Sequence, residues 1–219
     1  MYAMFTGIIE ELGSVKKITQ QGKTMEISIQ ATKIMPGLKH GESIAVNGVC
    51  LTVTRFTATD FTVDVMPETF HSTSLVALTE RTEVNLERAM PATGRFDGHF
   101  VTGHVDGIGE ILKKEHNENA IYFHISVSPD LSKYIVMKGS VAIDGISLTV
   151  FGIEADTLIV SIIPHTARET VLGQKATGDS VNLETDMLAK YLYYFVHEHR
   201  AGEQLESKIT EQFLQRNGF

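Results

Sequence analysis

The chain has 219 residues and a formal net charge of −8 at pH 7, with a sequence pI near 5.6. This acidic balance argues against a nucleic-acid partner, because phosphate recognition needs a basic surface, and we attribute it to ordinary solubility. A single cysteine, Cys50, excludes an internal disulfide and a zinc site built from several cysteines. No segment resembles a leader or is long enough to span a bilayer, so the sequence predicts a cytoplasmic protein without a membrane partner.

Two stretches, residues 43–53 (SIAVNGVCLTV) and 140–150 (SVAIDGISLTV), have nearly the same sequence. Six of the eleven aligned positions are identical, and the second stretch follows the first by 97 residues. Each places Asn-Gly or Asp-Gly between two apolar runs. These dipeptides tolerate the positive φ angles of a tight turn, so each stretch predicts a β-hairpin.

Three further blocks of the chain repeat in the same order. They pair residues 4–9 with 100–105, 64–69 with 161–166, and 84–87 with 181–184. Four blocks repeated in register indicate a duplicated domain. We therefore expect one domain in residues 1–98, a second in 99–186 and a helical segment in 187–219, with a linker rich in Gly, Pro, Ala and Thr at 89–98.

Apolar residues within each unit alternate with a period of two, as in Met25, Ile27 and Ile29. The pattern predicts strands near residues 4–15, 24–30, 43–47, 50–56, 61–66 and 82–88, and the second unit repeats the set. So many short strands favour a closed antiparallel barrel, which leaves no sheet edge. The predicted fold is all-β with a C-terminal α-helix: two tandem, homologous, six-stranded, Greek-key-like barrels. Short helical turns are expected after Ala31, Thr69, Pro129 and Thr166.

The period changes to that of a helix after Asp186, which is placed to cap the helix start. The apolar side chains of Leu188, Tyr191, Leu192 and Phe195 recur at helical spacing. This stripe either packs on its own domain or forms a contact between subunits. A second short helix is expected at residues 208–215, ending at Asn-Gly.

The sequence contains no phosphate-binding loop, dinucleotide fingerprint or nucleophile elbow. Two histidine pairs, His99 with His104 and His197 with His199, are candidate metal ligands, but neither has a third ligand nearby. We therefore predict no metal site.

The two copies differ mainly in polar residues near strand ends. The differing pairs are Cys50/Ser147, Ile8/His104, Asn47/Asp144, Gly41/Lys138 and Glu68/His165. Both copies keep hydroxyl side chains in register, at Ser43/Ser140, Thr52/Thr149 and Thr69/Thr166. Such a set suits a pocket for a small polar heterocycle, although each hydroxyl alone is ordinary on a pleated sheet. An enzyme that joins two like molecules and a ligand carrier fit these residues equally well.

These blocks, together with GHFVTGHVDG at 98–107, closely resemble the riboflavin synthase alpha-chain family from Met4 to about Val196. The resemblance implies a dismutation in which one 6,7-dimethyl-8-ribityllumazine gives a four-carbon unit to another. The products are riboflavin and 5-amino-6-ribitylamino-uracil, and no cofactor is used. It also implies a homotrimer gathered by the C-terminal helix, with each active site between the first barrel of one chain and the second barrel of a neighbour. Some members of this family associate with a lumazine synthase shell, and the sequence leaves that partner open.

The resemblance also assigns site residues by motif, with Phe5 near the site. The lumazine at the first barrel would meet Gly7, Ile8, Ile9, Ser43, Cys50, Leu51, Thr52, Asp64, Val65, Met66, Pro67, Glu68 and Thr69. The lumazine at the second barrel would meet Gly103, His104, Val105, Lys138, Ser147, Leu148, Thr149, Ser161, Ile162, Ile163, Pro164, His165 and Thr166. We expect His104 to carry a proton, because its unperturbed pKa lies near operating pH. Cys50 and Ser147 are the other expected catalytic groups, and Asp186 either orients Ser147 or only caps the helix.

Two alternatives compete with the enzyme. One is a non-catalytic lumazine- or flavin-binding homologue, like the optical antenna proteins that resemble this family. The other is a trimeric scaffold without a ligand, which leaves the hydroxyls in register unexplained. The catalytic-motif residues Cys50, His99, His104, Lys138, Ser147 and Thr149 are all present, which favours the enzyme.

Overall fold

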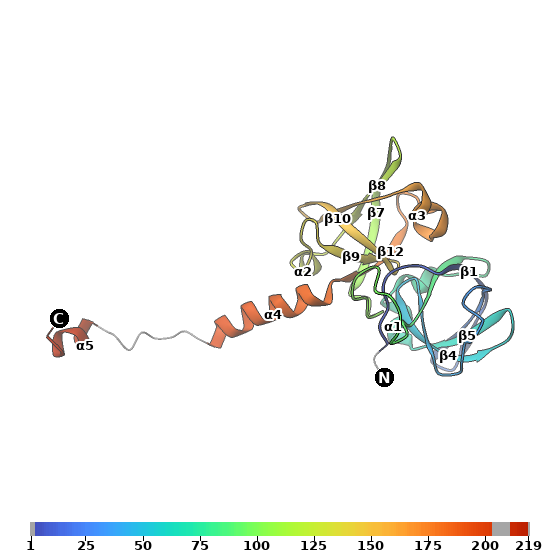
Figure 1. Cartoon of the computed structure of the whole chain (residues 1–219), viewed down its shortest axis with the longest axis horizontal. Coiled ribbons are helices and arrows are strands. Elements are labelled where there is room, and N and C mark those ends of the chain that lie inside the picture. The colour runs from blue at the N-terminus through green and yellow to red at the C-terminus, as the bar shows by residue number, and fades with distance from the viewer. Residues whose placement is uncertain (1–2, 203–210, 219) are drawn as a thin grey trace.

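The structure, a computed structural model, describes residues 3–202 and 211–218 and consists of two barrels and a projecting helix (Figure 1). The first barrel contains β1 (Glu11–Gln21), β2 (Thr24–Gln30), β3 (Ser43–Val46), β4 (Val49–Phe56), β5 (Asp60–Val65) and β6 (Glu83–Arg88). The second contains β7 (Gly107–Asn117), β8 (Ala120–Ser126), β9 (Ser140–Ile143), β10 (Ile146–Glu154), β11 (Thr157–Ile162) and β12 (Ser180–Thr185). Both barrels are closed and antiparallel with equivalent strand order, β1-β2-β5-β4-β3-β6 in the first, which confirms the predicted fold class.

Both predicted hairpins form, and their turns face each other at the junction of the barrels. Asn47 and Gly48 have φ angles of 45° and 78°, and Asp144 and Gly145 have 45° and 79°. Positive φ at both central residues is what a two-residue type I′ turn requires. A Cβ atom on Gly48 would lie 2.6 Å from the Gly145 nitrogen, so the two backbones touch where only glycine fits.

A symmetric pair of asparagines joins the barrels. The Asn85 side chain donates to the Asp144 carbonyl at 2.9 Å, and that of Asn182 donates to the Asn47 carbonyl at 2.8 Å. Both asparagines are buried, and their side-chain oxygens accept from backbone N–H groups of the opposite unit, at Val171 and Ser74. Because buried amides are costly when unpaired, these bonds fix the relative placement of the two barrels.

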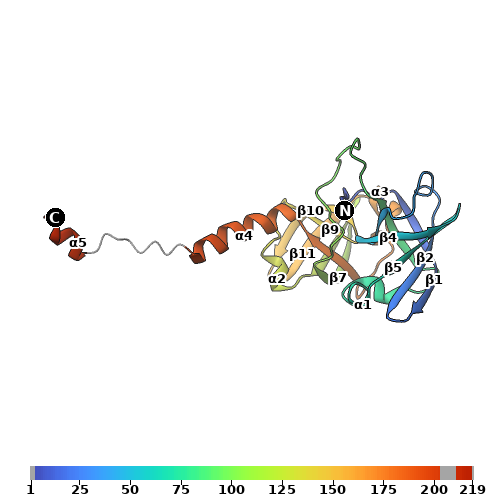
Figure 2. The ribbon, with the colours of Figure 1, turned by 90° about the horizontal axis from the view of Figure 1, so that it is seen from below.

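Residues 4–10 are not part of the first strand, so the predicted strand start near residue 4 is wrong. β1 begins at Glu11, and the preceding segment runs along the junction of the barrels (Figure 2). There Phe5, which is completely buried, forms an isolated antiparallel bridge with Val101. The positive φ of Gly7, 77°, turns the chain away from the strand path.

The helical turns are where expected except after Ala31. The structure has α1 (Pro67–His71), α2 (Pro129–Ser132) and α3 (Pro164–Glu169), with the 3₁₀ helices η1 (Ser74–Ala77) and η2 (Val171–Gly173). The prediction after Ala31 is wrong, because the backbone N–H groups of Thr32, Lys33 and Ile34 donate to the Glu11 carboxylate across a series of turns.

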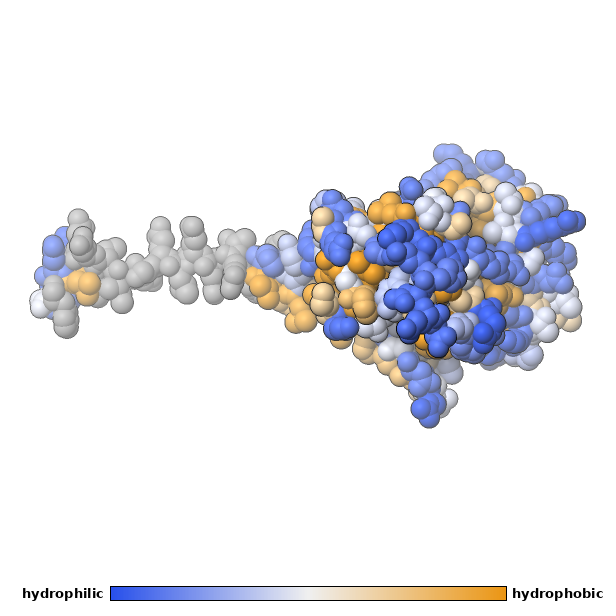
Figure 3. Space-filling model, turned by 90° about the horizontal axis from the view of Figure 1, so that it is seen from above, coloured by the Kyte–Doolittle hydropathy of each residue, from blue (hydrophilic) through white to orange (hydrophobic). Residues whose placement is uncertain are grey.

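Helix α4 (Met187–Gly202) starts at the predicted cap, where the Asp186 carboxylate accepts from the Leu188 N–H at 2.9 Å. Its apolar stripe does not pack on its own domain: Tyr191, Leu192 and Phe195 are 58%, 65% and 54% exposed. Figure 3 shows hydrophobic surface on the part of the helix next to the second barrel. Near its start, the Tyr193 ring meets Tyr134 of the second barrel at 5.1 Å.

A short helix α5 (Glu211–Arg216) overlaps the predicted second helix, whose first residues, 208–210, lie outside the described residues. None of the helices in residues 3–202 and 211–218 combines the length and apolar character needed to cross a bilayer.

Candidate active site

The segments that precede the two barrels are exchanged between them. Residues 5–9 lead into the first barrel, yet the Gly7 carbonyl accepts from the Ser147 N–H of β10 at 2.8 Å. Residues 101–105 lead into the second barrel, yet the Gly103 carbonyl accepts from the Cys50 N–H of β4 at 2.9 Å. Each predicted catalytic position, Cys50 or Ser147, is therefore covered by a segment from the other half of the chain.

Two buried glutamates hold these segments in place. Glu87 of β6 accepts from the N–H and hydroxyl of Thr6 at 2.6 and 2.7 Å and from the Gly7 N–H at 3.0 Å. Glu184 of β12 binds Thr102 and Gly103 with the same three distances. Burial raises the pKa of both carboxyls, and these hydrogen bonds oppose that shift. Each carboxylate thus anchors a segment of its own half over the pocket of the other.

The exchanged segments approach the catalytic strands so closely that only glycine fits. A Cβ atom on Gly7 would lie 2.6 Å from the Ser147 Cβ, and one on Gly103 would lie 2.5 Å from the Cys50 Cβ. Both glycines have positive φ, 77° and 78°. The sequence motif Thr-Gly in each copy is therefore a requirement of close backbone approach.

This exchange corrects the predicted grouping of the site residues. Gly7 lies at the second barrel and Gly103 at the first, the reverse of the expected assignment. Ile9 packs against the second core and Val105 against the first. Ile8 lines a cavity beside the first barrel, and His104 is exposed next to Gly103.

The second barrel carries a pocket of about 360 Å³ that gathers most of its predicted site residues. It is lined by Lys138, Ser147, Leu148, Thr149, Ser161, Ile162, Ile163 and Thr166, and by Phe151, which the sequence reasoning missed. Pro164 and His165 are exposed in α3 beside it. The mixture of apolar walls and hydroxyl groups suits a flat polar heterocycle.

A larger cavity, about 1000 Å³, lies between the first barrel and residues 89–98. Of the predicted residues, Ile8, Ser43 and Thr52 line it. The other first-barrel residues lie on neighbouring strands or on the turn into α1: Cys50, Leu51, Asp64, Val65, Met66, Pro67, Glu68 and Thr69. Among these, Val65 is fully buried in the core and Met66 is 65% exposed. Phe5, expected near the site, supports the junction from inside and has no exposed surface.

Cys50 sits at the first barrel with a protonated thiol. Burial raises the pKa of Cys50, a hydrogen bond with Ser43 lowers it, and the nearby Glu184 charge raises it further. A thiol with a raised pKa is a hydrogen-bond donor rather than a thiolate nucleophile at neutral pH. His104 follows Gly103, whose carbonyl accepts from the Cys50 N–H, so the chain brings these two predicted catalytic residues to the same part of the first barrel.

Ser147, at the second barrel, pairs with a histidine that sequence reasoning did not connect to it. The Ser147 hydroxyl lies 2.7 Å from Nδ1 of His99, and the buried Nε2 has no hydrogen-bond partner among the described residues. Burial lowers the pKa of His99, and the negative charge of Asp186 partly opposes this. His99 is therefore a neutral imidazole at neutral pH, able to accept a proton from Ser147. Asp186, expected to orient Ser147, acts on its partner His99.

Gly98 is the sequence feature that could have indicated the pairing of Ser147 with His99. A Cβ atom there would lie 1.9 Å from the Thr6 carbonyl oxygen and 3.2 Å from the Ser147 Cβ. Glycine lets the chain pass this crossing, and the next residue, His99, then donates its N–H to the same Thr6 carbonyl. Within the described part of the chain, no three His, Cys, Asp or Glu side chains gather as a metal site.

Replacing Asp186 by asparagine should lower the pKa of His99 further, because a charge that favours the imidazolium is removed. Asparagine caps a helix as well as aspartate, so α4 keeps its start. If turnover needs neutral His99, the acid-side loss of kcat should move to lower pH in Asp186→Asn. A pH–rate profile, with the His99 ring titration followed by NMR, measures this. A shift of either curve to higher pH would contradict the prediction.

Comparison with known proteins agrees with this architecture. A family model described as lumazine binding domain matches residues 6–89 and 102–186, so the chain is a lumazine-binding-domain protein with two repeats. Riboflavin synthases from Bacillus subtilis and Actinobacillus pleuropneumoniae are 51% and 50% identical over 216 residues, covering 99% of this chain and 100% of each relative. The chain belongs to the riboflavin synthase family, whose members are transferases of riboflavin biosynthesis.

Solved structures of more distant relatives share the fold. LumP complexed with 6,7-dimethyl-8-(1'-D-ribityl) lumazine has a TM-score of 0.75, and LumP complexed with riboflavin has 0.77. Both are 27% identical and cover 83% of this chain and 99% of LumP.

Proposed function

We propose that this enzyme dismutates two molecules of 6,7-dimethyl-8-ribityllumazine. One molecule gives a four-carbon unit to the other, and the products are riboflavin and 5-amino-6-ribitylamino-uracil. The two products together contain all the atoms of the two substrates, so the reaction needs no oxidant, reductant or other cofactor. The single cysteine fits a reducing compartment, and we place the enzyme in the cytoplasm.

The observation that carries this proposal is the doubled site. Each half of the chain presents one catalytic position, Cys50 or Ser147, and each is completed by the other half through Gly103 or Gly7. A reaction between two identical molecules needs two similar sites that differ in their polar groups. The residues proposed to contact substrate are those named above, regrouped so that Gly7 and Ile9 serve the second barrel and residues 103–105 the first, while Ile8 stays at the first-barrel cavity that it lines.

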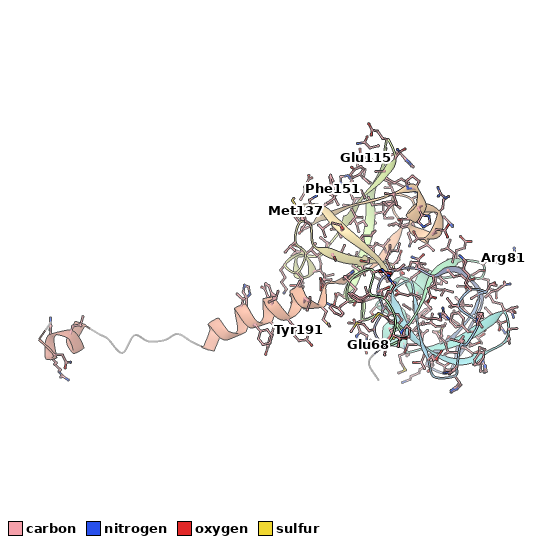
Figure 4. The ribbon with its side chains drawn as sticks, in the orientation of Figure 1. Glu68, Arg81, Glu115, Met137, Phe151 and Tyr191 are labelled. Carbon is pink, nitrogen blue, oxygen red and sulfur yellow. The ribbon has the colours of Figure 1, made fainter. Side chains whose placement is uncertain are left out.

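The two proposed sites of one chain lie on different parts of the molecule. Figure 4 shows Glu68 at the first barrel and Phe151 at the second, well separated on the molecule. The reacting pair of lumazines must therefore be brought together by two chains. The exposed apolar stripe of α4, including Tyr191, offers the surface for that association, and we propose a homotrimer held through this helix.

The residues divide the chemistry between the sites. One lumazine must lose a proton from its C7 methyl group, and His104, beside Cys50, is the proton carrier. The other must accept an oxygen nucleophile at C7. Ser147, with His99 as its proton acceptor, either supplies this oxygen from its hydroxyl or orients a water molecule that does. The conjugated ring stabilises the anion itself, so holding the two rings in reacting orientation is the main contribution of the protein, worth several kcal/mol.

A carrier is the second candidate, because LumP structures contain bound lumazine and riboflavin. The purified chain should be incubated with 6,7-dimethyl-8-ribityllumazine alone, and the riboflavin absorbance followed. One riboflavin formed for every two lumazines consumed supports the dismutation. Tight binding with an unchanged lumazine spectrum over hours would make the protein a carrier.

Replacing His104 by alanine should lower kcat about 100-fold, because the proton carrier is lost. Lumazine affinity should change by no more than about 3-fold, since the exposed ring contributes little to binding. The His116→Ala variant, at an exposed position of β7, is the control and should behave like the unchanged enzyme. Equal losses of kcat and affinity in His104→Ala would move this residue from chemistry to binding.

A further inference from the structure

Lys138 adopts a backbone conformation that lysine rarely takes. Its φ is 65°, in the left-handed region that favours glycine. The equivalent residue of the first barrel is Gly41, with φ 85°, and both positions donate their N–H to the matching strand residue, Val150 or Val53. A lysine therefore occupies a position that the first barrel fills with glycine, and its side chain lines the second-barrel pocket.

An aromatic pair holds the Lys138 side chain. Its ammonium lies 5.1 Å from the centroid of the Phe151 ring, and the Phe151 ring meets Tyr122 edge to face at 5.2 Å. A cation over an aromatic face is attracted by the ring quadrupole. Lys138 and Phe151 both line the second-barrel pocket, and Figure 4 shows Phe151 at the outer edge of that barrel, near Met137.

The first barrel has no counterpart of this arrangement. Strand register matches Lys138 with Gly41, Phe151 with Thr54 and Tyr122 with Glu26. Thr54 instead donates its hydroxyl to the Thr62 carbonyl, and Glu26 pairs with Arg55. All three members of the cation–aromatic cluster are thus present in one barrel and absent from the other.

We propose that Phe151, supported by Tyr122, is a positioning residue that holds the Lys138 ammonium at the second-barrel pocket and so strengthens lumazine binding there. This inference rests on the proposed function, since it takes lumazine as the ligand. The cluster makes the two pockets unequal, because only the second pocket holds an ammonium over an aromatic ring, where it can meet the electron-rich carbonyl edge of the heterocycle. The arginines that line the first cavity, Arg88 and Arg95, are paired with Glu10 and Asp97. Phe151 acts through Lys138.

Lumazine titrations of the full chain test the proposal. Phe151→Leu keeps an apolar side chain but removes the ring face, and it should weaken binding at one of the two sites about 10-fold. Phe151→Tyr keeps the face and should retain the affinity of the unchanged chain. Thr54→Val, at the matching position of the first barrel, should alter neither site.

A double-mutant cycle separates positioning from packing. In a Lys138→Met background, where the charge is already absent, Phe151→Leu should have almost no further effect. The proposal would be overturned if Phe151→Leu lost the same affinity in both backgrounds, or if Phe151→Leu left the affinity unchanged. It would also be overturned if Phe151→Tyr did not retain the affinity of the unchanged chain. Riboflavin formation by the unchanged chain is measured in parallel. If lumazine binds without turnover, the dismutation fails and the affinities still decide the role of Phe151; if lumazine does not bind at all, both proposals fail.

Discussion

The Gly103→Ala variant should lose riboflavin formation by at least about 100-fold and be less stable by about 3 kcal/mol. The new Cβ atom would lie 2.5 Å from the Cys50 Cβ and 2.9 Å from the Cys50 nitrogen. The backbone cannot move apart there without breaking the hydrogen bond between the Cys50 N–H and the Gly103 carbonyl. The exchanged segment would move away, and His104 would move with it. Denaturant unfolding measures the stability, and lumazine titration with the riboflavin assay measures the site.

The control for this variant is Gly178→Ala. Gly178 also has a positive φ, 95°, but its Cβ atom would meet nothing within 4 Å. Its free energy of unfolding should fall only by the cost of the left-handed conformation, about 1 kcal/mol, and its activity should be unchanged. If Gly103→Ala lost no more stability and activity than Gly178→Ala, backbone strain alone would explain both results. The close approach of Gly103 to Cys50 would then not matter for function.

The sequence predicts most of the fold because its signals are local. The Asn-Gly and Asp-Gly turns, the period of two and the Asp186 cap each depend on neighbouring residues, and the structure forms all of them. The duplication strengthens these predictions, because a pattern that occurs twice in register is unlikely to arise by chance.

The exchange of segments could not be predicted, for a reason that lies in the duplication itself. Residues 4–9 and 100–105 have equivalent sequences and meet equivalent strands, so either pairing satisfies the same local rules. The Thr-Gly motif and its glutamate partner, Glu87 or Glu184, look the same in both arrangements. Which barrel each segment covers depends on the path of the chain across the junction. Gly98 permits this path, but no local sequence pattern predicts it.

The Lys138–Phe151 pair was hidden for a different reason. Lys138 differs conspicuously between the two copies, because a charged residue takes the place of Gly41. Phe151 replaces Thr54 inside a strand, where an aromatic residue is ordinary and gives no signal. Only the position of its ring beside the ammonium links it to the pocket.

Ser147 and His99 should behave as one catalytic unit. Their side chains lie 2.7 Å apart, and burial keeps the imidazole of His99 neutral by lowering its pKa. Ser147→Ala removes the hydroxyl, and His99→Ala removes its proton acceptor, so each should reduce kcat about 100-fold. Because either change breaks the same hydrogen bond, the double variant should lose little more than either single variant. Single-turnover riboflavin formation measures all four proteins.

Fully additive losses would instead separate the two residues, with His99 supporting the junction and Ser147 acting alone. Two further measurements decide this. His99→Gln retains a hydrogen-bonding side chain but cannot act as a base near neutral pH, so it should keep the lumazine affinity and lose the turnover. The pH–rate profile of Ser147→Ala should also lose its acid limb, because the titration of His99 matters for the rate only while the Ser147 hydroxyl has a proton to give it.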